Sequence, residues 1–160
     1  MKKITFILFA LIAGTTFAQT EEGTADVNAE IVSPISIAEG TALDFGQIIG
    51  AVTGGDVTIS NDGATRTIAA TLDVPSSGFS SAAFEVTASD LYTYSITIPV
   101  TTITDGTTTM DVSFTHDKAA SGNVGDGLAQ TVNVGGTLTV GNNQPSGLYS
   151  GTVTVQVAYE

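Results

Sequence analysis

The chain has 160 residues and a formal net charge of −12, with 16 acidic residues against 4 lysines and arginines, and it contains neither cysteine nor tryptophan. The lack of cysteine excludes disulfide bonds and a lipid anchor attached to a cysteine. The acidic residues are scattered and no basic patch accompanies them, which argues against nucleic acid as a partner and favours a solvated, non-adhesive surface.

The N-terminus has the pattern of a secretory signal peptide. Two lysines precede an almost wholly apolar stretch over residues 4–17, and Thr16 and Ala18 place small residues at the two positions that a signal peptidase reads. We predict cleavage after Ala18, so that residues 1–18 are removed and the protein is secreted to the periplasm, the outer-membrane surface or the medium of a Gram-negative bacterium. A membrane helix would need roughly 20 apolar residues, so we expect no membrane span after cleavage.

The remainder of the chain predicts a short tail and one domain. Residues 19–26 are polar and show no apolar alternation, which is typical of a mobile tail. Residues 27–160 have a length that suits a single domain with one core. Thr, Val, Ile, Gly and Ser dominate, and no window repeats apolar residues at spacings of three and four, so we predict an all-β fold.

Apolar residues alternate with period two in a series of short segments, which predicts strands. In chain order these segments are 27–31 (resuming at 35–37 after a proline), 43–48, 57–59, 68–72, 82–88, 92–98, 110–114, 132–134, 138–140 and 153–159. Asn61, Asp62 and Gly63 form a turn signal that makes a hairpin of the segments on either side. About nine strands with turn signals about every 8 to 12 residues predict an antiparallel β-sandwich.

In the C-terminal segment, residues 153–159, the apolar side chains lie on one face. This face must pack against a second layer, so we expect the chain to end inside a sheet. Tyr92 and Tyr94 share a strand face with two isoleucines and are expected in or near the core, rather than as a ligand platform.

Residues 116–127 are rich in small and turn-forming residues and predict a surface loop.

Catalytic groups are scarce. His116 is the one histidine, and a hydrolytic site would need Ser113 to reach it while Asp117, its neighbour in sequence, cannot easily orient it from behind. Carboxylate pairs for glycoside hydrolysis can be drawn from Asp105, Asp111 or Glu85, but no tryptophan is present to stack on a sugar. We therefore expect a protein that is not an enzyme and that binds no cofactor.

Calcium is the most plausible ion, because side-chain oxygens are available in the predicted loops. The candidates are Asp56, Asn61 and Asp62, or Asn123 and Asp126. Their spacing matches no known calcium loop, and turn chemistry explains the Asn-Asp-Gly sequence fully. A stand-alone secreted domain that binds glycan or calcium remains the alternative to a structural role.

Three segments together resemble known proteins: residues 27–37 (VNAEIVSPISI), 43–46 (LDFG) and 135–151 (GGTLTVGNNQPSGLYSG). They resemble a family of secreted bacterial proteins defined as a domain of unknown function, over essentially the whole chain after the signal peptide. The LDFG element and the QPxGxY approach to a valine-rich end are also similar to spore coat protein U and the archaic chaperone-usher pilins. This similarity implies an immunoglobulin-like sandwich that is exported and assembled as a pilus- or coat-like structural subunit.

The pilin resemblance implies a role for the C-terminal segment. Pilins have a glycine fourteen residues from the end, then alternating apolar residues and a penultimate tyrosine, and here those positions are Gly147, Val153, Val155, Val157 and Tyr159. In the pilins a periplasmic chaperone docks on this assembly strand by adding an edge strand.

The resemblance also implies a role for Val27, Ala29 and Ile31. These residues are either a donor strand that pairs with the same or a related subunit, or the first strand of a complete sandwich. The first alternative leaves the domain one strand short, and the sequence does not decide between the two.

Overall fold

The computed structural model describes residues 20–160, so the predicted signal peptide at residues 1–18 lies outside the described residues. The chain divides into a segment that ends at Ile31 and a compact unit, Val32–Glu160. Residues 20–31 are exposed and belong to no strand. The first strand begins only at Ser36, so Val27, Ala29 and Ile31 belong to none of the described strands, and their predicted role stays a prediction.

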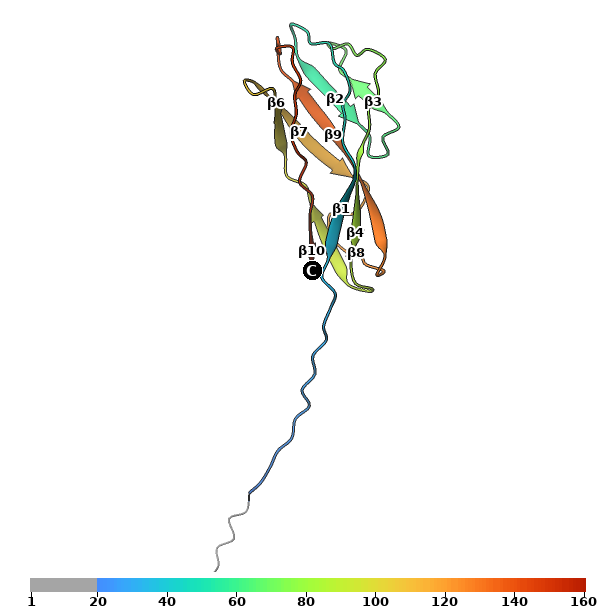
Figure 1. Ribbon diagram of the computed structural model, residues 1–160, viewed down its shortest axis with the longest axis vertical. Coiled ribbons are helices and arrows are strands. Elements are labelled where there is room, and N and C mark those ends of the chain that lie inside the picture. Colours follow the sequence, from blue (N-terminus) through green and yellow to red (C-terminus); the bar gives the residue numbers. More distant parts are fainter. Residues whose placement is uncertain (1–19) are drawn as a thin grey trace, which may run out of the picture. The chain divides into compact units, whose positions relative to one another are not determined.

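The larger of two antiparallel sheets has seven strands (Figure 1). They are β1 (Ser36–Thr41), β2 (Gly55–Ile59), β3 (Arg66–Ile68), β4 (Ala82–Thr87), β6 (Thr101–Thr104), β7 (Thr109–His116) and β9 (Ala129–Val140). The long strand β9 holds the sheet together, because it pairs with β4 through its first half, with β2 through its second half, and also with β7. Strand β1 pairs only with β4 and is therefore an edge strand.

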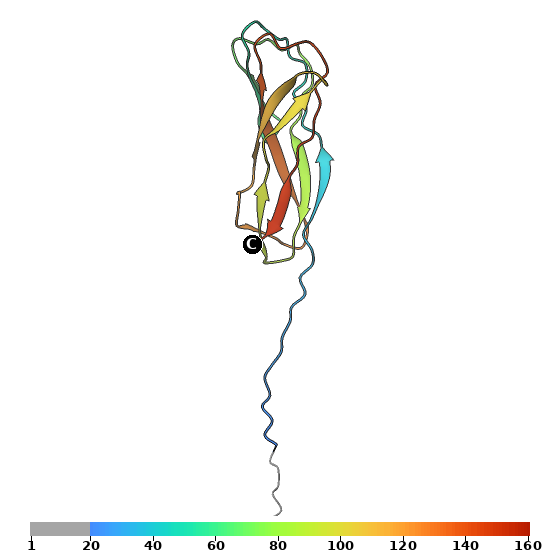
Figure 2. The ribbon, with the colours of Figure 1, turned by 90° about the vertical axis from the view of Figure 1, so that its left-hand side faces the viewer.

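The smaller sheet has three strands in the order β10-β5-β8. These are β10 (Gln156–Tyr159), β5 (Thr93–Thr97) and β8 (Asn123–Val124). Figure 2 shows β10, in red, next to β5. None of the described residues forms a helix that could span a bilayer. The two packed antiparallel sheets confirm the predicted all-β sandwich.

One half of the compact unit has side chains from both sheets in its core, and we call it the closed half. Strands β4 and β9 of the larger sheet face β5 of the smaller one there. Its buried side chains are Ala82, Phe84, Val86, Ala88, Tyr94, Ile96, Val132 and Val134.

The other half has only the larger sheet as a regular layer, and we call it the open half. Strands β2, β7 and β9 supply its buried row, and connecting segments supply Phe45 and Leu72 in place of a second sheet. Its buried side chains are Phe45, Val57, Ile59, Leu72, Met110, Val112, Leu138 and Val140.

Several predicted boundaries need correction. Residues 132–140 form one continuous strand instead of two, because Gly135 and Gly136 lie where the chain packs tightly: a Cβ on Gly135 would collide with the Ile59 carbonyl oxygen. Strand β6 begins two residues after Pro99 and was not predicted. The predicted strand at residues 43–48 makes only one isolated bridge, between Asp44 and Ser80. Within the predicted surface loop at residues 116–127, Asn123 begins β8, which pairs with β5.

Candidate functional site

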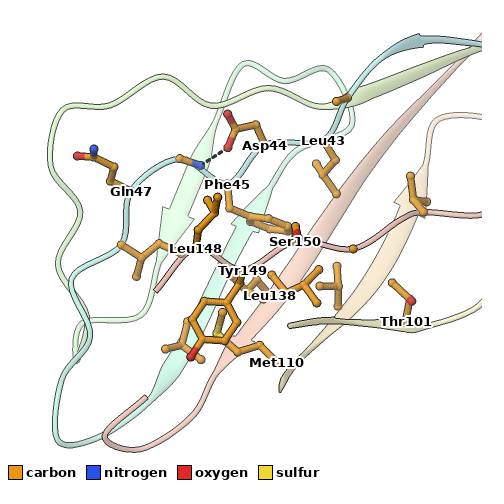
Figure 3. Close-up of a pocket in the computed structure, with 18 of the residues that line it drawn as sticks. Leu43, Asp44, Phe45, Gln47, Thr101, Met110, Leu138, Leu148, Tyr149 and Ser150 are labelled. Carbon is orange, nitrogen blue, oxygen red and sulfur yellow. Dashed lines mark hydrogen bonds between the residues drawn. The ribbon is translucent and has the colours of Figure 1, made fainter. Parts of the chain in front are cut away.

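An apolar groove of about 900 Å³ lies over the open half. One border is β1 with its continuation to Gly50, and the other is the segment 144–153 that leads toward β10. Figure 3 shows Leu43 and Phe45 on the first border, Leu148, Tyr149 and Ser150 on the second, and Met110 and Leu138 on β7 and β9. The volume is at the upper end of what small-ligand pockets offer, about 1,000 Å³.

The floor of the groove comes from the inward rows of β7 and β9. Side chains alternate across a strand, so Met110 and Val112 of β7 share one face with Leu138 and Val140 of β9. All four are buried, whereas the side chains on the walls range from buried Phe45 to exposed Leu148. The half-buried apolar side chains that line the groove are Leu43, Ile48, Ile103, Phe114, Tyr149 and Val153.

The first border is attached to the domain on the side that faces away from the groove. Asp44 exchanges both backbone hydrogen bonds with Ser80, and the Ile49 amide donates to the Asp73 carbonyl, 2.8 Å away. Ser80 and Asp73 do not line the groove, so the paired edge of this border points outward. The carboxylate of Asp44 accepts a further hydrogen bond from the Gly46 amide at 2.8 Å (Figure 3).

Arg66 fixes this border by its guanidinium group. It donates to the carbonyl oxygens of Phe45 at 2.9 Å and Pro75 at 3.1 Å. Its guanidinium carbon also lies 5.1 Å from the centre of the Phe79 ring, within cation–π range. One of the few cations of the chain thus connects two otherwise irregular segments, around Phe45 and around residues 75–79.

The second border runs into an unpaired stretch, residues 151–155, of which only residues 151–153 line the groove. Ser150 exchanges both backbone hydrogen bonds with Thr104, and pairing resumes at Gln156 in β10. No backbone hydrogen bond involves residues 151–155 in the described part of the chain. Extended backbone with free amides and carbonyls is a template for an added strand.

Tyr149 anchors the beginning of this border. Its hydroxyl lies 2.7 Å from the Thr108 hydroxyl, accepts from the Gln144 side-chain amide at 3.0 Å and donates to the Pro145 carbonyl at 2.9 Å. Thr108 belongs to a turn in which the Asp105 carboxylate accepts the amides of Thr107 and Thr108, and these bonds lower the pKa of Asp105.

The structure divides the predicted assembly strand between the groove and the closed half. Gly147 and Val153 line the groove. Val155, Val157 and Tyr159 are half-buried against the core of the closed half, as the predicted dry face requires. A Cβ on Gly147 would lie only 3.2 Å from a carboxylate oxygen of Asp105, which explains a glycine at the groove border.

The structure does not bring the candidate hydrolytic residues together. Ser113 faces outward from β7, whereas His116 belongs to the inward row of the same strand. The carboxylate of Asp117 accepts from the backbone and side-chain amides of Asn133, at 2.9 and 2.8 Å, and is not directed at the imidazole. Nδ1 of His116 is buried without a hydrogen-bond partner. Asp111 and Glu85 also face outward, and Glu85 accepts from Thr131.

The candidate calcium ligands are engaged in turns and strand contacts. Asp62 accepts from the hydroxyl of Ser60 and the amide of Ala64, and these two bonds lower its pKa. The Asn61 side-chain oxygen accepts from Thr115 at 2.6 Å, and Asp56 accepts from Thr139 at 3.0 Å.

The second candidate set is engaged in the same way. Asn123 donates its side-chain amide to the carbonyl of Ala119, and Asp126 accepts the amide of Leu128. Within residues 20–160, no three His, Cys, Asp or Glu side chains are grouped so as to hold a metal ion.

Tyr94 of β5 is a core residue, and Tyr92, just before this strand, is half-buried, which agrees with the prediction that the two lie in or near the core. Tyr94 is 1% exposed and donates its hydroxyl to the Gln130 side-chain oxygen at 2.9 Å. Burial, with a smaller effect from Asp126, raises the pKa of Tyr94. The Tyr92 ring meets the Tyr159 ring edge to face at 5.8 Å. The Tyr159 hydroxyl in turn accepts the Ser89 amide and donates to the Ser33 carbonyl.

Sequence reasoning did not find the groove. Alternation indicates which face of a strand is dry, but it does not indicate that residues 151–155 lack a partner or that β1 ends its sheet. One sequence signal bears on β1. The apolar alternation is interrupted at Pro34 and resumes after it, so residues 27–31 are separated from β1.

Comparison with known proteins defines a family for this chain. A family model described as a domain of unknown function (DUF4402) matches residues 35–159. No curated protein matches the chain, and no solved structure does. The matched range coincides with the sandwich, from the residue before β1 to the last residue of β10.

Proposed function

Because the chain belongs to the DUF4402 family of domains of unknown function, we propose its role from the groove: it is an exported, non-enzymatic structural subunit that joins other proteins by strand addition. In this proposal the groove is the acceptor site. The sequence similarity to spore coat protein U and chaperone-usher pilins supports the same reading, with a surface assembly as the product and a periplasmic chaperone as a second type of partner.

A single observation supports this proposal best: the groove lies between an edge strand of the larger sheet and the unpaired segment that leads to the edge strand of the smaller one. Strand β1 is the last strand of the larger sheet and β10 is the last strand of the smaller one. Residues of β1 and of the approach to β10, including Glu39 and Val153, line the groove from its two borders. An added strand would find free backbone groups at its sides and an apolar floor beneath it, which is the geometry of β-augmentation.

The lining also separates this role from the alternative of a glycan or calcium site. Calcium needs about six to eight oxygen ligands, whereas the floor here is formed by buried apolar side chains and the walls mix apolar residues with scattered polar ones. The groove therefore favours an apolar partner with an extended backbone.

The experiment is a localisation and assembly assay on producing cells. Antibodies against the purified chain are applied to intact cells before and after external protease treatment, and cell extracts are run on gels with and without heating. We expect surface labelling, loss of signal on protease treatment and a heat-sensitive ladder of high-mass species. A protein confined to the cytoplasm, or present on the surface only as a monomer, would contradict the proposal.

A further inference from the structure

We propose that Thr108 and Gln144 become joined by an intramolecular ester bond, a covalent cross-link that the folded chain forms by itself. The hydroxyl of Thr108 attacks the side-chain carbonyl carbon of Gln144, and ammonia leaves. This cross-link goes beyond the proposed function and does not rest on it, because the reaction takes place within a single chain and needs no partner.

The Thr108 hydroxyl has the surroundings of an activated nucleophile. It donates a hydrogen bond to Oδ1 of Asp105 at 3.3 Å, and its oxygen lies 2.7 Å from the Tyr149 hydroxyl. All three side chains are half-buried, so water competes for these contacts only in part. A hydroxyl is a weak nucleophile until a neighbouring base accepts its proton, and Asp105 lies where such a base is needed.

Asp105 is held in the charged form that a base requires. The amides of Thr108 and Thr107 donate to its carboxylate and lower its pKa, and the hydroxyls of Thr108 and Tyr149 add smaller effects in the same direction. Gly147 leaves space for this carboxylate, since a Cβ there would lie 3.2 Å from Oδ2. The acceptor of the proton is therefore ionised and fixed beside the hydroxyl.

The amide group of Gln144 lies against the same hydroxyl. Its nitrogen is 3.5 Å from the Thr108 oxygen and donates to the Tyr149 hydroxyl at 3.0 Å. Its oxygen lies beside Gly141, where a Cβ would be only 2.7 Å from it. The carbonyl carbon is bonded directly to the nitrogen, and the last torsion of a glutamine side chain is broad. A rotation about this torsion therefore presents the carbon to the hydroxyl.

The atoms and charges of the reaction balance without a co-reactant. Oγ1 of Thr108 forms a bond to Cδ of Gln144 while Asp105 takes the hydroxyl proton. The bond between Cδ and the nitrogen then breaks, and the proton passes from Asp105 through the Tyr149 hydroxyl to the departing nitrogen, which leaves as ammonia. Tyr149 is placed for this transfer because its hydroxyl contacts both the nucleophile and the leaving nitrogen.

The cross-link closes a loop between two segments of the open half. Thr108 belongs to the turn between β6 and β7, and Gln144 lies 36 residues later, at the beginning of the second border of the groove. A covalent bond across such a loop stabilises a fold mainly by restricting the unfolded chain, as a disulfide does. The chain contains no cysteine, so an ester supplies the kind of cross-link that a disulfide cannot supply here.

Trypsin provides a direct test, because it cleaves after lysine and arginine. Lys118 lies between Thr108 and Gln144, so the two residues belong to different tryptic peptides, 67–118 and 119–160. The full-length chain is purified, denatured and digested. We expect the two peptides to remain joined, with a mass lower than their sum by about 17 Da, one molecule of ammonia. Hydroxylamine, which cleaves esters under conditions that leave amides intact, should separate them.

Two pairs of variants assign the bond to these residues. Thr108→Val removes the nucleophile and Gln144→Glu removes the amide, and we expect both chains to yield separate peptides. The matched controls are Thr107→Val, in the same turn, and Gln47→Glu, at an exposed glutamine of the groove, and both should keep the joined peptide. Thermal melts of the four chains verify that each is folded.

A further variant tests the base. Asp105→Asn keeps an oxygen that accepts the hydrogen bonds of the turn but takes up no proton, so cross-linking should slow at least about a hundredfold, followed by mass in samples taken at intervals after synthesis.

Three results would overturn the proposal. In the first, the parent chain yields separate peptides, either of unchanged mass or with Gln144 simply converted to glutamate. In the second, the joined peptide persists in Thr108→Val, so that the bond lies elsewhere. In the third, hydroxylamine fails to separate the peptides, so that the bond is not an ester.

Discussion

The closed half and the open half of the sandwich each have eight buried hydrophobic residues among those described, but they obtain them differently. In the closed half the larger sheet meets Tyr94 and Ile96 from a second sheet. In the open half no residue of the second sheet contributes, and Phe45 and Leu72 come from connecting segments. The difference shows that a core can be filled without a complete second layer. The open half then keeps a backbone stretch, residues 151–155, that has no hydrogen-bond partner.

The largest expected effect comes from truncating one isoleucine in each half. Ile96 is 3% exposed, so Ile96→Ala should lower the free energy of unfolding by about 2–5 kcal/mol. Ile103 is half-buried on the groove wall, and Ile103→Ala should cost about half as much. Urea denaturation of both variants measures the two losses. Equal losses would show that the wall of the groove is packed as tightly as the closed core.

The next comparison concerns the two faces of the C-terminal segment. Val155 is half-buried against the closed core, so Val155→Asp should lower stability by about 2–3 kcal/mol. Thr154 is exposed, and Thr154→Asp should change stability by less than about 0.5 kcal/mol. Thermal and urea melts of the monomer check both values. If both substitutions are severe, the segment is covered on both faces.

Arg66 tests whether the irregular border of the open half depends on one cation. Removing a charged donor from two carbonyls should cost about 1.5–3 kcal/mol in Arg66→Ala. Lys118 is exposed, and Lys118→Ala removes the same charge with an expected change below about 0.5 kcal/mol. Hydrogen exchange at residues 42–50 should accelerate in Arg66→Ala alone. Similar exchange in the two variants would show that the border is held by its backbone pairs.

Two tyrosine hydroxyls allow a finer comparison, since each fixes a chain segment in a different half. Tyr159→Phe removes the link between Ser33 and Ser89, and Tyr149→Phe removes the contact with Thr108. Each should cost about 1 kcal/mol. Hydrogen exchange should increase near Ser33 in the first variant and near Thr108 in the second. An increase in both places in either variant would mean that the two halves are coupled.

The smallest effect is a dependence on pH. Hydrogen bonds from Ser60 and Ala64 lower the pKa of Asp62, and those from Thr108 and Thr107 lower the pKa of Asp105, both from 3.8. A carboxyl with a lowered folded pKa contributes stability that is present above its unfolded value and is lost as the pH falls through the folded one. Stability should therefore fall as the pH drops below 3.8.

The matched control for this pH dependence is the double variant Asp62→Asn, Asp105→Asn. Asparagine keeps a side-chain oxygen that can accept these hydrogen bonds but does not titrate. Melts between pH 7 and pH 3 should show a shallower decline in the double variant than in the parent. An identical decline would assign the acid sensitivity to other carboxyls.

Sequence reasoning predicted the sandwich because burial in strands follows alternation, as in β4, where every second side chain is buried. It failed where tertiary contact overrides local signals. Gly135 and Gly136 have the sequence of a turn, but they continue β9 because a neighbouring strand approaches too closely for a side chain. Only part of the candidate site could be predicted from the sequence. Val153 and Val155 were assigned to the correct face of the C-terminal segment. The lack of a backbone hydrogen-bond partner at residues 151–155 depends on how the two sheets assemble.

The Tyr159 hydroxyl has a mechanical consequence, because it connects the last strand to Ser33, near the start of the compact unit. Tension applied to the residues before Val32 reaches this hydrogen bond first and then enters β1. The hydrogen bonds of an antiparallel pair lie perpendicular to the strands, so tension along β1 loads its five pairs with β4 in shear, all together, instead of peeling them one after another. We expect a domain held in this way to resist tension along β1 more strongly than its number of hydrogen bonds alone suggests.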